Sequence, residues 1–254
     1  MRKIDQRNFI RALSLASLSV GAMILTPPVH AAPVAIPGIS TLQDLINAGH
    51  SGITVGDKNY YDFTYAGAPL ASASPSPANP APTASQISVT QPDASIQGFR
   101  FSYNWNSTTF SGNNQDSLIS YSVHVLDTSP QNFIETVGLD FGATAGGGIL
   151  DNSTVSEKVL TLDGTGTYGT LNVKEFGPGN PNNVDSAAFD LPGGIRDLRL
   201  TKDIAVHSSS TTFQQGFATI AYVDNTFKDV PEPVAGSFLM VGAGMLLVRR
   251  RKLV

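Results

Sequence analysis

The sequence predicts an all-β protein, built as an antiparallel sandwich of two sheets, and three observations support this prediction. Gly occurs 24 times and Pro 16 times among 254 residues, while only 14% of the residues are charged. This composition is typical of many strands joined by tight turns. Short segments of alternating apolar and polar residues recur from residue 86 to residue 222. No helical pattern alternates with them, so parallel βαβ units are not expected.

One short helix is expected ahead of the strands, over residues 41–48. Its apolar residues fall on one face, Ser40 is positioned to cap its start, and Gly49 is positioned to end it. Two strands are expected next, at 52–55 and 59–65, with a turn between them. In the second of these, three aromatic side chains alternate with polar ones and are predicted to share a face: Tyr61, Phe63 and Tyr65.

The remaining strands follow at the spacing expected of a sandwich. They are predicted at 86–90, 97–105, 117–127, 133–141, 155–162, 167–176, 186–191, 198–206 and 214–222. Asp163-Gly164 favours a hairpin turn, because Gly accepts a positive φ. Aromatic residues at every second position from Phe99 to Trp105 predict a buried face. The strand that contains Tyr121 repeats this pattern, with His124 on its polar face.

A stretch rich in Pro, Ser and Ala interrupts the strands at residues 68–85. It is predicted to be a long loop within one domain, because about 35 residues before it are too few for a separate core. The exported domain is therefore expected to span residues 32–229.

The N-terminus, residues 1–31, has the three parts of a secretory signal peptide. Basic residues precede an apolar run from Ala12 to Leu25, and small residues lead to a predicted cleavage by signal peptidase after Ala31. An uncleaved anchor is the alternative, although the run is shorter than the ~20 residues that a membrane span needs. The segment around Arg7 also resembles a twin-arginine signal that lacks its first Arg, so the general secretory route is favoured.

The C-terminal segment, residues 230–254, combines three features in order. A Pro-Glu-Pro tripeptide comes first: Pro231, Glu232 and Pro233. An apolar helix is expected over residues 234–248, and its 15 residues would extend only about 22 Å, short of the ~30 Å hydrocarbon core. A basic cluster that resists translocation follows, made of Arg249, Arg250, Arg251 and Lys252. This segment is suited to transient rather than permanent retention in a membrane.

This order of tripeptide, short apolar helix and basic cluster resembles the PEP-CTERM sorting domain of Gram-negative bacteria. The resemblance implies that an exosortase, a membrane enzyme with a Cys nucleophile, recognises the tail and cleaves it near the tripeptide. It also links the protein to exopolysaccharide production and biofilm formation. A plain tail anchor is the alternative interpretation. The sortase pattern Leu-Pro-x-Thr-Gly does not precede the helix.

The charge of the body excludes some classes of partner. Residues 32–229 contain 8 basic and 18 acidic residues, a net charge of −10, which argues against nucleic-acid binding. The chain has no Cys, so disulfides, thiol nucleophiles and thiolate metal sites are excluded.

A search for catalytic chemistry identifies no candidate residues. The exported part retains three histidines, and none has a second histidine or an acid at metal-ligand spacing: His50, His124 and His207. Gly-x-Ser-x-Gly and phosphate-binding loops are absent from the sequence. The glutamates of the body show no spacing that singles out a glycosidase pair: Glu135, Glu157 and Glu175. No enzyme activity and no resident metal or cofactor are predicted.

Two ligands are nevertheless considered. Calcium is a weak hypothesis, based on oxygen-bearing side chains in two loops, although turn chemistry also explains them: Asn180, Asn182, Asn183 and Asp185, and Asp151-Asn152. Sugar stacking is the other hypothesis, although aromatic residues on an alternating face are usually core: Tyr60, Tyr103, Trp105 and Phe110.

The leading functional hypothesis is an exported protein of the cell surface or extracellular matrix, processed by an exosortase and structural rather than enzymatic. The alternative is a polysaccharide-binding module, with or without calcium. Both hypotheses expect passage across the inner membrane and transient contact with it through residues 234–248.

Overall fold

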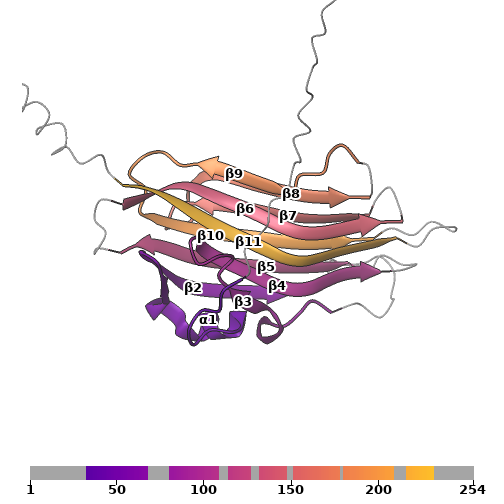
Figure 1. The fold of residues 1–254 in the computed structure, drawn as a ribbon, viewed down its shortest axis with the longest axis horizontal. Helices are drawn as coiled ribbons and strands as arrows, with labels where there is room; N and C mark the ends of the chain where they lie inside the picture. The colour runs from indigo at the N-terminus through magenta and orange to yellow at the C-terminus, as the bar shows by residue number, and fades with distance from the viewer. Residues whose placement is uncertain are drawn as a thin grey trace, which may run out of the picture. The chain divides into compact units, whose positions relative to one another are not determined.

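The computed structural model describes residues 33–67, 80–108, 114–126, 132–147, 151–177, 180–208 and 216–231. These residues form two antiparallel sheets that face each other (Figure 1), so the predicted all-β sandwich is confirmed. The predicted signal-peptide helix, the cleavage site Ala31, the tail helix 234–248 and the basic cluster 249–252 all lie outside the described residues.

The six-stranded sheet has, in spatial order, β1 (Ile53–Val55), β2 (Lys58–Gly67), β5 (Gln115–Val125), β10 (Asp197–His207), β7 (Asn152–Leu160) and β8 (Thr167–Phe176). The five-stranded sheet has β3 (Ser88–Thr90), β4 (Gln97–Thr108), β11 (Phe217–Pro231), β6 (Asn132–Gly146) and β9 (Ser186–Asp190). Every pair of neighbouring strands is antiparallel. Two 3-10 turns, η1 (Gly49–Ser51) and η2 (Ala84–Gln86), flank the first hairpin.

Helix α1 (Leu42–Ala48) begins one residue later than expected, and its cap differs from the predicted one. Thr41, rather than Ser40, is the N-cap, and its hydroxyl accepts a hydrogen bond from the backbone N–H of Asp44. The Asp44 carboxylate in turn accepts from the backbone N–H of Thr41 at 2.9 Å, which completes a capping box. Gly49 ends the helix as predicted, with a positive φ of 57°.

The inner faces of the two sheets form the core. The alternation in β4 and β5 correctly predicts this, because Phe99, Phe101, Trp105 and Tyr121 are all buried. Aromatic rings from both sheets meet there. Tyr60 and Phe99 lie edge to face with ring centroids 4.6 Å apart, an arrangement that stabilises a core beyond its buried area.

Strand β2 differs from the predicted alternation in one important respect. Its register against β5 shifts between Tyr61 and Thr64, which marks a β-bulge. Tyr60 and Phe63 are consequently buried in the core, whereas Tyr61 is only partly buried. The prediction that Tyr61 and Phe63 share a face is therefore wrong, because an extra residue in one strand reverses the facing of the residues beyond it.

The predicted turn between β7 and β8 is correct, whereas some predicted strand and loop bounds are not. The hairpin between β7 and β8 turns at Asp163-Gly164 as expected, with a φ of 72° at Gly164. Strand β11, predicted to end at Tyr222, continues to Pro231. Residues 80–85, placed in the predicted loop, lead into η2.

None of the helices in the described residues has the length and apolar character that crossing a membrane requires.

Candidate functional site

Of the aromatic residues considered for sugar stacking, those that the structure describes lie in or against the core. Tyr60 and Trp105 are fully buried, and the indole N–H of Trp105 donates to the Ser117 hydroxyl at 3.0 Å. Tyr103 is partly buried and packs edge to face on Trp105. Phe110 lies outside the described residues. The interpretation of this aromatic face as core is therefore correct for Tyr60 and Trp105.

The loop considered for calcium uses its amides in local turns. The Asn180 side-chain oxygen accepts from the backbone N–H of Asn182 at 2.9 Å, and that of Asn183 accepts from the backbone N–H of Phe176 at 2.9 Å. Within the part of the chain that the structure describes, no three His, Asp or Glu side chains gather as a metal site would require. Calcium binding stays a prediction.

His50 and His124 have acidic partners that the sequence did not indicate. His50 Nδ1 lies 3.1 Å from a carboxylate oxygen of Asp62, and His124 Nδ1 lies 2.7 Å from one of Asp197. His207 ends β10. The acids are 12 and 73 residues away in the chain, so the spacing search along the sequence did not reveal them.

Both histidine–aspartate pairs belong to one cluster on the outer face of the six-stranded sheet, which we call the Tyr61 site. Its members are His50, Tyr61, Asp62, Ser122, His124 and Asp197. Strand register brings them together, because Tyr61 lies opposite Ser122, and His124 lies opposite Asp197. Successive outward positions of neighbouring strands form one surface.

The bulge in β2 shapes this site. Asp62 has a φ of 55°, the only positive φ among non-glycine residues that the structure describes. Such a backbone conformation costs free energy, and conformations of this kind concentrate where a side chain must be placed for function. Here Tyr61, opposite Ser122, faces outward just before the bulge, and the Asp62 carboxylate within the bulge lies beside His50.

The turn η1 holds His50 against the same strand. A Cβ atom at Gly52 would lie 2.3 Å from the carbonyl oxygen of Tyr60, so the backbone after η1 packs directly on β2. The His50 ring meets the Tyr61 ring edge to face, with centroids 5.2 Å apart. The His50 side chain remains 85% exposed, so this end of the site is open to solvent.

Electrostatics at the site act on the Tyr61 phenol. Desolvation raises its pKa, the negative charges of Asp197 and Asp62 raise it further, and a hydrogen bond with Ser122 lowers it. The phenol is consequently protonated near neutral pH and is available as a hydrogen-bond donor. Tyr61 and Ser122 thus provide hydrogen-bonding groups on this outer face.

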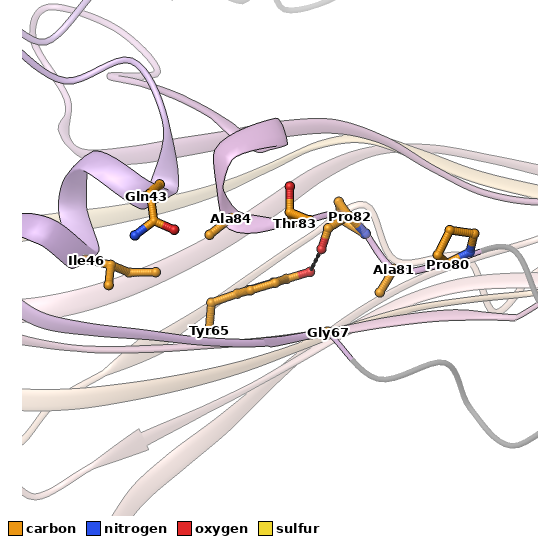
Figure 2. Close-up of a pocket in the computed structure, with 9 residues that line it drawn as sticks. All are labelled: Gln43, Ile46, Tyr65, Gly67, Pro80, Ala81, Pro82, Thr83 and Ala84. Carbon is orange, nitrogen blue, oxygen red and sulfur yellow. Dashed lines mark hydrogen bonds between the residues drawn. The ribbon is translucent and has the colours of Figure 1, made fainter.

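A hollow lies between α1 and β2, apart from the Tyr61 site, and has a volume of about 480 Å³. Figure 2 shows Tyr65 along one side of it, with Gln43 and Ala84 opposite. The Tyr65 hydroxyl donates to the carbonyl oxygen of Pro82 and lies 3.1 Å from the Ser117 hydroxyl. The Tyr65 hydroxyl therefore joins the segment before η2 to the sheet. Because this polar group already has two partners, the hollow is a weaker candidate for ligand binding.

The predicted sorting motif begins at the last residue of the sandwich strands that the structure describes. Pro231 is the last residue of β11 and lies opposite Asn132 of β6. Glu232 and Pro233 lie outside the described residues. Two residues before Pro231, a carboxylate oxygen of Asp229 lies 2.5 Å from Lys58 Nζ, and the Lys58 side chain is completely buried. The folded body therefore runs directly to the tripeptide.

No protein-family model and no curated protein matches this chain. Among solved structures, the enzymatically active domain of tailspike protein 4 of bacteriophage CBA120 is 11% identical, with a TM-score of 0.27. That match covers 65% of this chain and 19% of the tailspike chain, so the chain spans about a fifth of it.

Two smaller proteins are similar at the same level of identity. TmCBM61, solved in complex with β-1,4-galactotriose, is 11% identical over 52% of this chain and 70% of its own, with a TM-score of 0.25. Endoglucanase 3 of Trichoderma harzianum, from family GH12, is 11% identical over 65% of this chain and 98% of its own, with a TM-score of 0.22. Likenesses this distant carry no argument about activity, so function must be argued from the site.

Proposed function

We propose that this chain is an exported protein of the cell surface or extracellular matrix of a Gram-negative bacterium, and that an exosortase removes its tail. The body then acts without catalysing a reaction. One observation carries this proposal beyond the sequence pattern: the last strand of the sandwich ends at Pro231, the first residue of the tripeptide. The tail therefore follows the last strand that the structure describes, and this position in the chain is compatible with a cargo and its removable signal.

The sorting proposal is tested by replacing Pro231, Glu232 and Pro233 together with Ala in the native host. We expect the precursor to keep its tail, so the mass of the intact protein should include residues 234–254. A host that lacks its exosortase should show the same retained mass with the wild-type chain. Removal of the tail from the triple-alanine variant at the wild-type rate would contradict the proposal and favour another protease.

A second candidate function, polysaccharide binding, is favoured by the Tyr61 site. An outward tyrosine ring beside carboxylates and imidazoles offers both a stacking surface and hydrogen-bonding groups for sugar hydroxyls. The side chains of Asp62 and Asp197 are 50% and 42% exposed, so a ligand can reach them. Since the body carries a net charge of −10, it should repel acidic polymers, and we expect a neutral polysaccharide.

This function is tested by affinity electrophoresis of residues 32–231 in gels that contain neutral or acidic fractions of the host exopolysaccharide. Tyr61→Ala should weaken retention by the neutral fraction about tenfold, because truncating a tyrosine that anchors a ligand typically costs more than about 1 kcal/mol and about 1.4 kcal/mol is tenfold in affinity. Tyr222→Ala is the matched control, since Tyr222 is a partly buried tyrosine outside the site, on β11 of the five-stranded sheet. Equal retention of the wild-type body and the Tyr61→Ala variant would exclude this site, and release of reducing sugar would instead indicate a hydrolase.

A further inference from the structure

The end of β11 is held differently from the rest of that strand. Pairing with β4 stops at Phe227 opposite Gln97, whereas pairing with β6 continues to Pro231 opposite Asn132. Residues 228–231 thus pair with β6 alone, and a register shift between Lys228 and Asp229 interrupts that pairing. The last three residues, Asp229 to Pro231, are therefore held by a strand on one side only and are the part of β11 that detaches most easily.

One buried ion pair compensates for this weak end. Lys58 Nζ on β2 lies 2.5 Å from an Asp229 carboxylate oxygen, donates to Asp57 Oδ1 at 2.9 Å and donates to Gln97 Oε1 at 2.5 Å. Asp57 Oδ2 also accepts from the Asn132 side chain at 2.7 Å, opposite Pro231 in the sheet. The ammonium group thus ties the end of β11 to the opposite sheet. The Lys58 side chain is completely buried and that of Asp229 is only 14% exposed, so the lost contact would be poorly replaced by water.

A protease needs more than access to one bond. It binds its substrate as an extended peptide on both sides of the bond that is cut, and residues paired in a sheet cannot enter its cleft. Strand β11 includes the first residue of the tripeptide, Pro231. For a cut next to Pro231, the residues on the acyl side of the broken bond are therefore those that pair with β6 and contact Lys58. Detachment of Asp229 to Pro231 must therefore precede cleavage next to Pro231.

We propose that the Lys58–Asp229 ion pair is a latch that limits access of the processing enzyme to Pro231, Glu232 and Pro233. This inference rests on the proposed sorting function. When the latch is closed, the strand end stays in the sheet and the tail is retained. When it opens, one peptide C–N bond breaks, the acyl carbon passes to water or to a primary amine, and the leaving nitrogen takes the proton released. The latch makes removal of the tail depend on opening of the strand end.

The experiment compares full-length precursors in the native host by pulse labelling and intact-mass spectrometry. Asp229→Ala removes the latch while leaving Lys58 paired with Asp57, and we expect the tail to be removed at least threefold faster. Lys228→Ala is the matched control. This neighbouring residue forms an exposed pair with Glu135 at 3.2 Å, and its loss should leave the rate unchanged. If Asp229→Ala fails to accumulate as folded protein, Asp229→Asn tests the charge alone and should increase the rate in the same direction.

A flexible insertion before the tripeptide distinguishes the latch from a general loss of stability of the body. Gly-Ser-Gly-Ser placed between Val230 and Pro231 gives the enzyme a flexible acyl side, so the rate should rise and should no longer respond to Asp229→Ala. Hydrogen exchange of the purified full chain in detergent provides a second readout. The amides of Asp229 and Val230 should exchange faster in Asp229→Ala, while those at the centre of β11 stay unchanged.

The two proposals fail in different ways. Equal processing rates for the wild-type chain and Asp229→Ala, with processing still blocked by the triple-alanine tripeptide, would overturn the latch alone. Processing of the triple-alanine variant at the wild-type rate would overturn the sorting function. A rate that still responds to Asp229→Ala after the insertion would also overturn the latch, because it would indicate an effect on the stability of the whole body.

Discussion

At the scale of single residues, two carboxyl groups on the outer face of the six-stranded sheet lie close enough for one to raise the pKa of the other. Asp116 of β5 and Asp203 of β10 are diagonal neighbours, since Asp116 lies opposite Ala205 and Asp203 lies opposite Leu118. Desolvation, a hydrogen bond with Asp203 and repulsion by its charge together raise the pKa of Asp116 to about 7. A proton shared between such groups makes stability depend on pH.

The sign of this dependence follows from the raised pKa. Below pH 3.8 Asp116 is protonated in both the folded and the unfolded chain. Between about pH 4 and pH 7 only the folded chain keeps the proton, so the free energy of unfolding falls as pH rises through this window. The loss should be about 1 kcal/mol after allowance for solvent screening of this partly exposed group.

Asp116→Asn should flatten this dependence, because the amide keeps a donor for Asp203 without a titrating proton. Urea denaturation of the body at pH 4, 5.5, 7 and 8 measures the effect, with the variant at least as stable as the wild type at pH 8. Asp203→Asn should flatten the curve as well, because it removes the charge that raises the pKa of Asp116. An unchanged slope in both variants would show that the pair does not share a proton.

At the scale of elements, alternation predicts a strand well when its inner positions are apolar. Strands β4 and β5 follow this rule, and their buried faces are correctly predicted. Strand β11 continues beyond its predicted end at Tyr222, through Asp224, Asn225 and Thr226, which do not alternate with apolar residues. Asn225 is nevertheless a fully buried inner residue. A buried polar residue whose partner lies on another strand interrupts the apolar alternation from which a strand is predicted.

The Tyr61 site could not be predicted for a related reason. It depends on a bulge in β2 and on the register of β2, β5 and β10, and neither can be read from spacing along the chain. The sequence does place His124 on the polar face of its strand. The spacing of residues along the chain does not indicate that Asp197, 73 residues further on, lies opposite His124.

At the scale of the whole molecule, polar contacts join the two sheets at more than one place. In the interior, Lys202 Nζ lies 2.6 Å from Glu157 Oε2, and both side chains are completely buried in the six-stranded sheet. The side-chain amide of Asn225, from the five-stranded sheet, donates to both oxygens of Glu157 at 2.8 and 2.7 Å. Burial lowers the pKa of Lys202, and the adjacent Glu157 opposes that shift. This network requires one particular alignment of the sheets, which a purely apolar interface would not enforce as strictly.

The network predicts a strong asymmetry between single and paired substitutions. Lys202→Met should lower the free energy of unfolding of residues 32–231 by about 3–5 kcal/mol, because it leaves the Glu157 charge buried without a cation. The double variant Lys202→Met with Glu157→Leu should recover most of that loss, since two apolar side chains of similar volume replace the pair.

Lys158→Met is the control for this prediction, because Lys158 lies on the exposed side of β7, next to Glu157 in sequence. It should change stability by less than about 0.5 kcal/mol, as is usual for a surface substitution. Urea denaturation of the four proteins gives all the values required. If Lys202→Met and Lys158→Met cost the same, loss of the cation does not leave a costly buried charge at Glu157. If the double variant restores stability, the buried pair adds little net stability over apolar side chains.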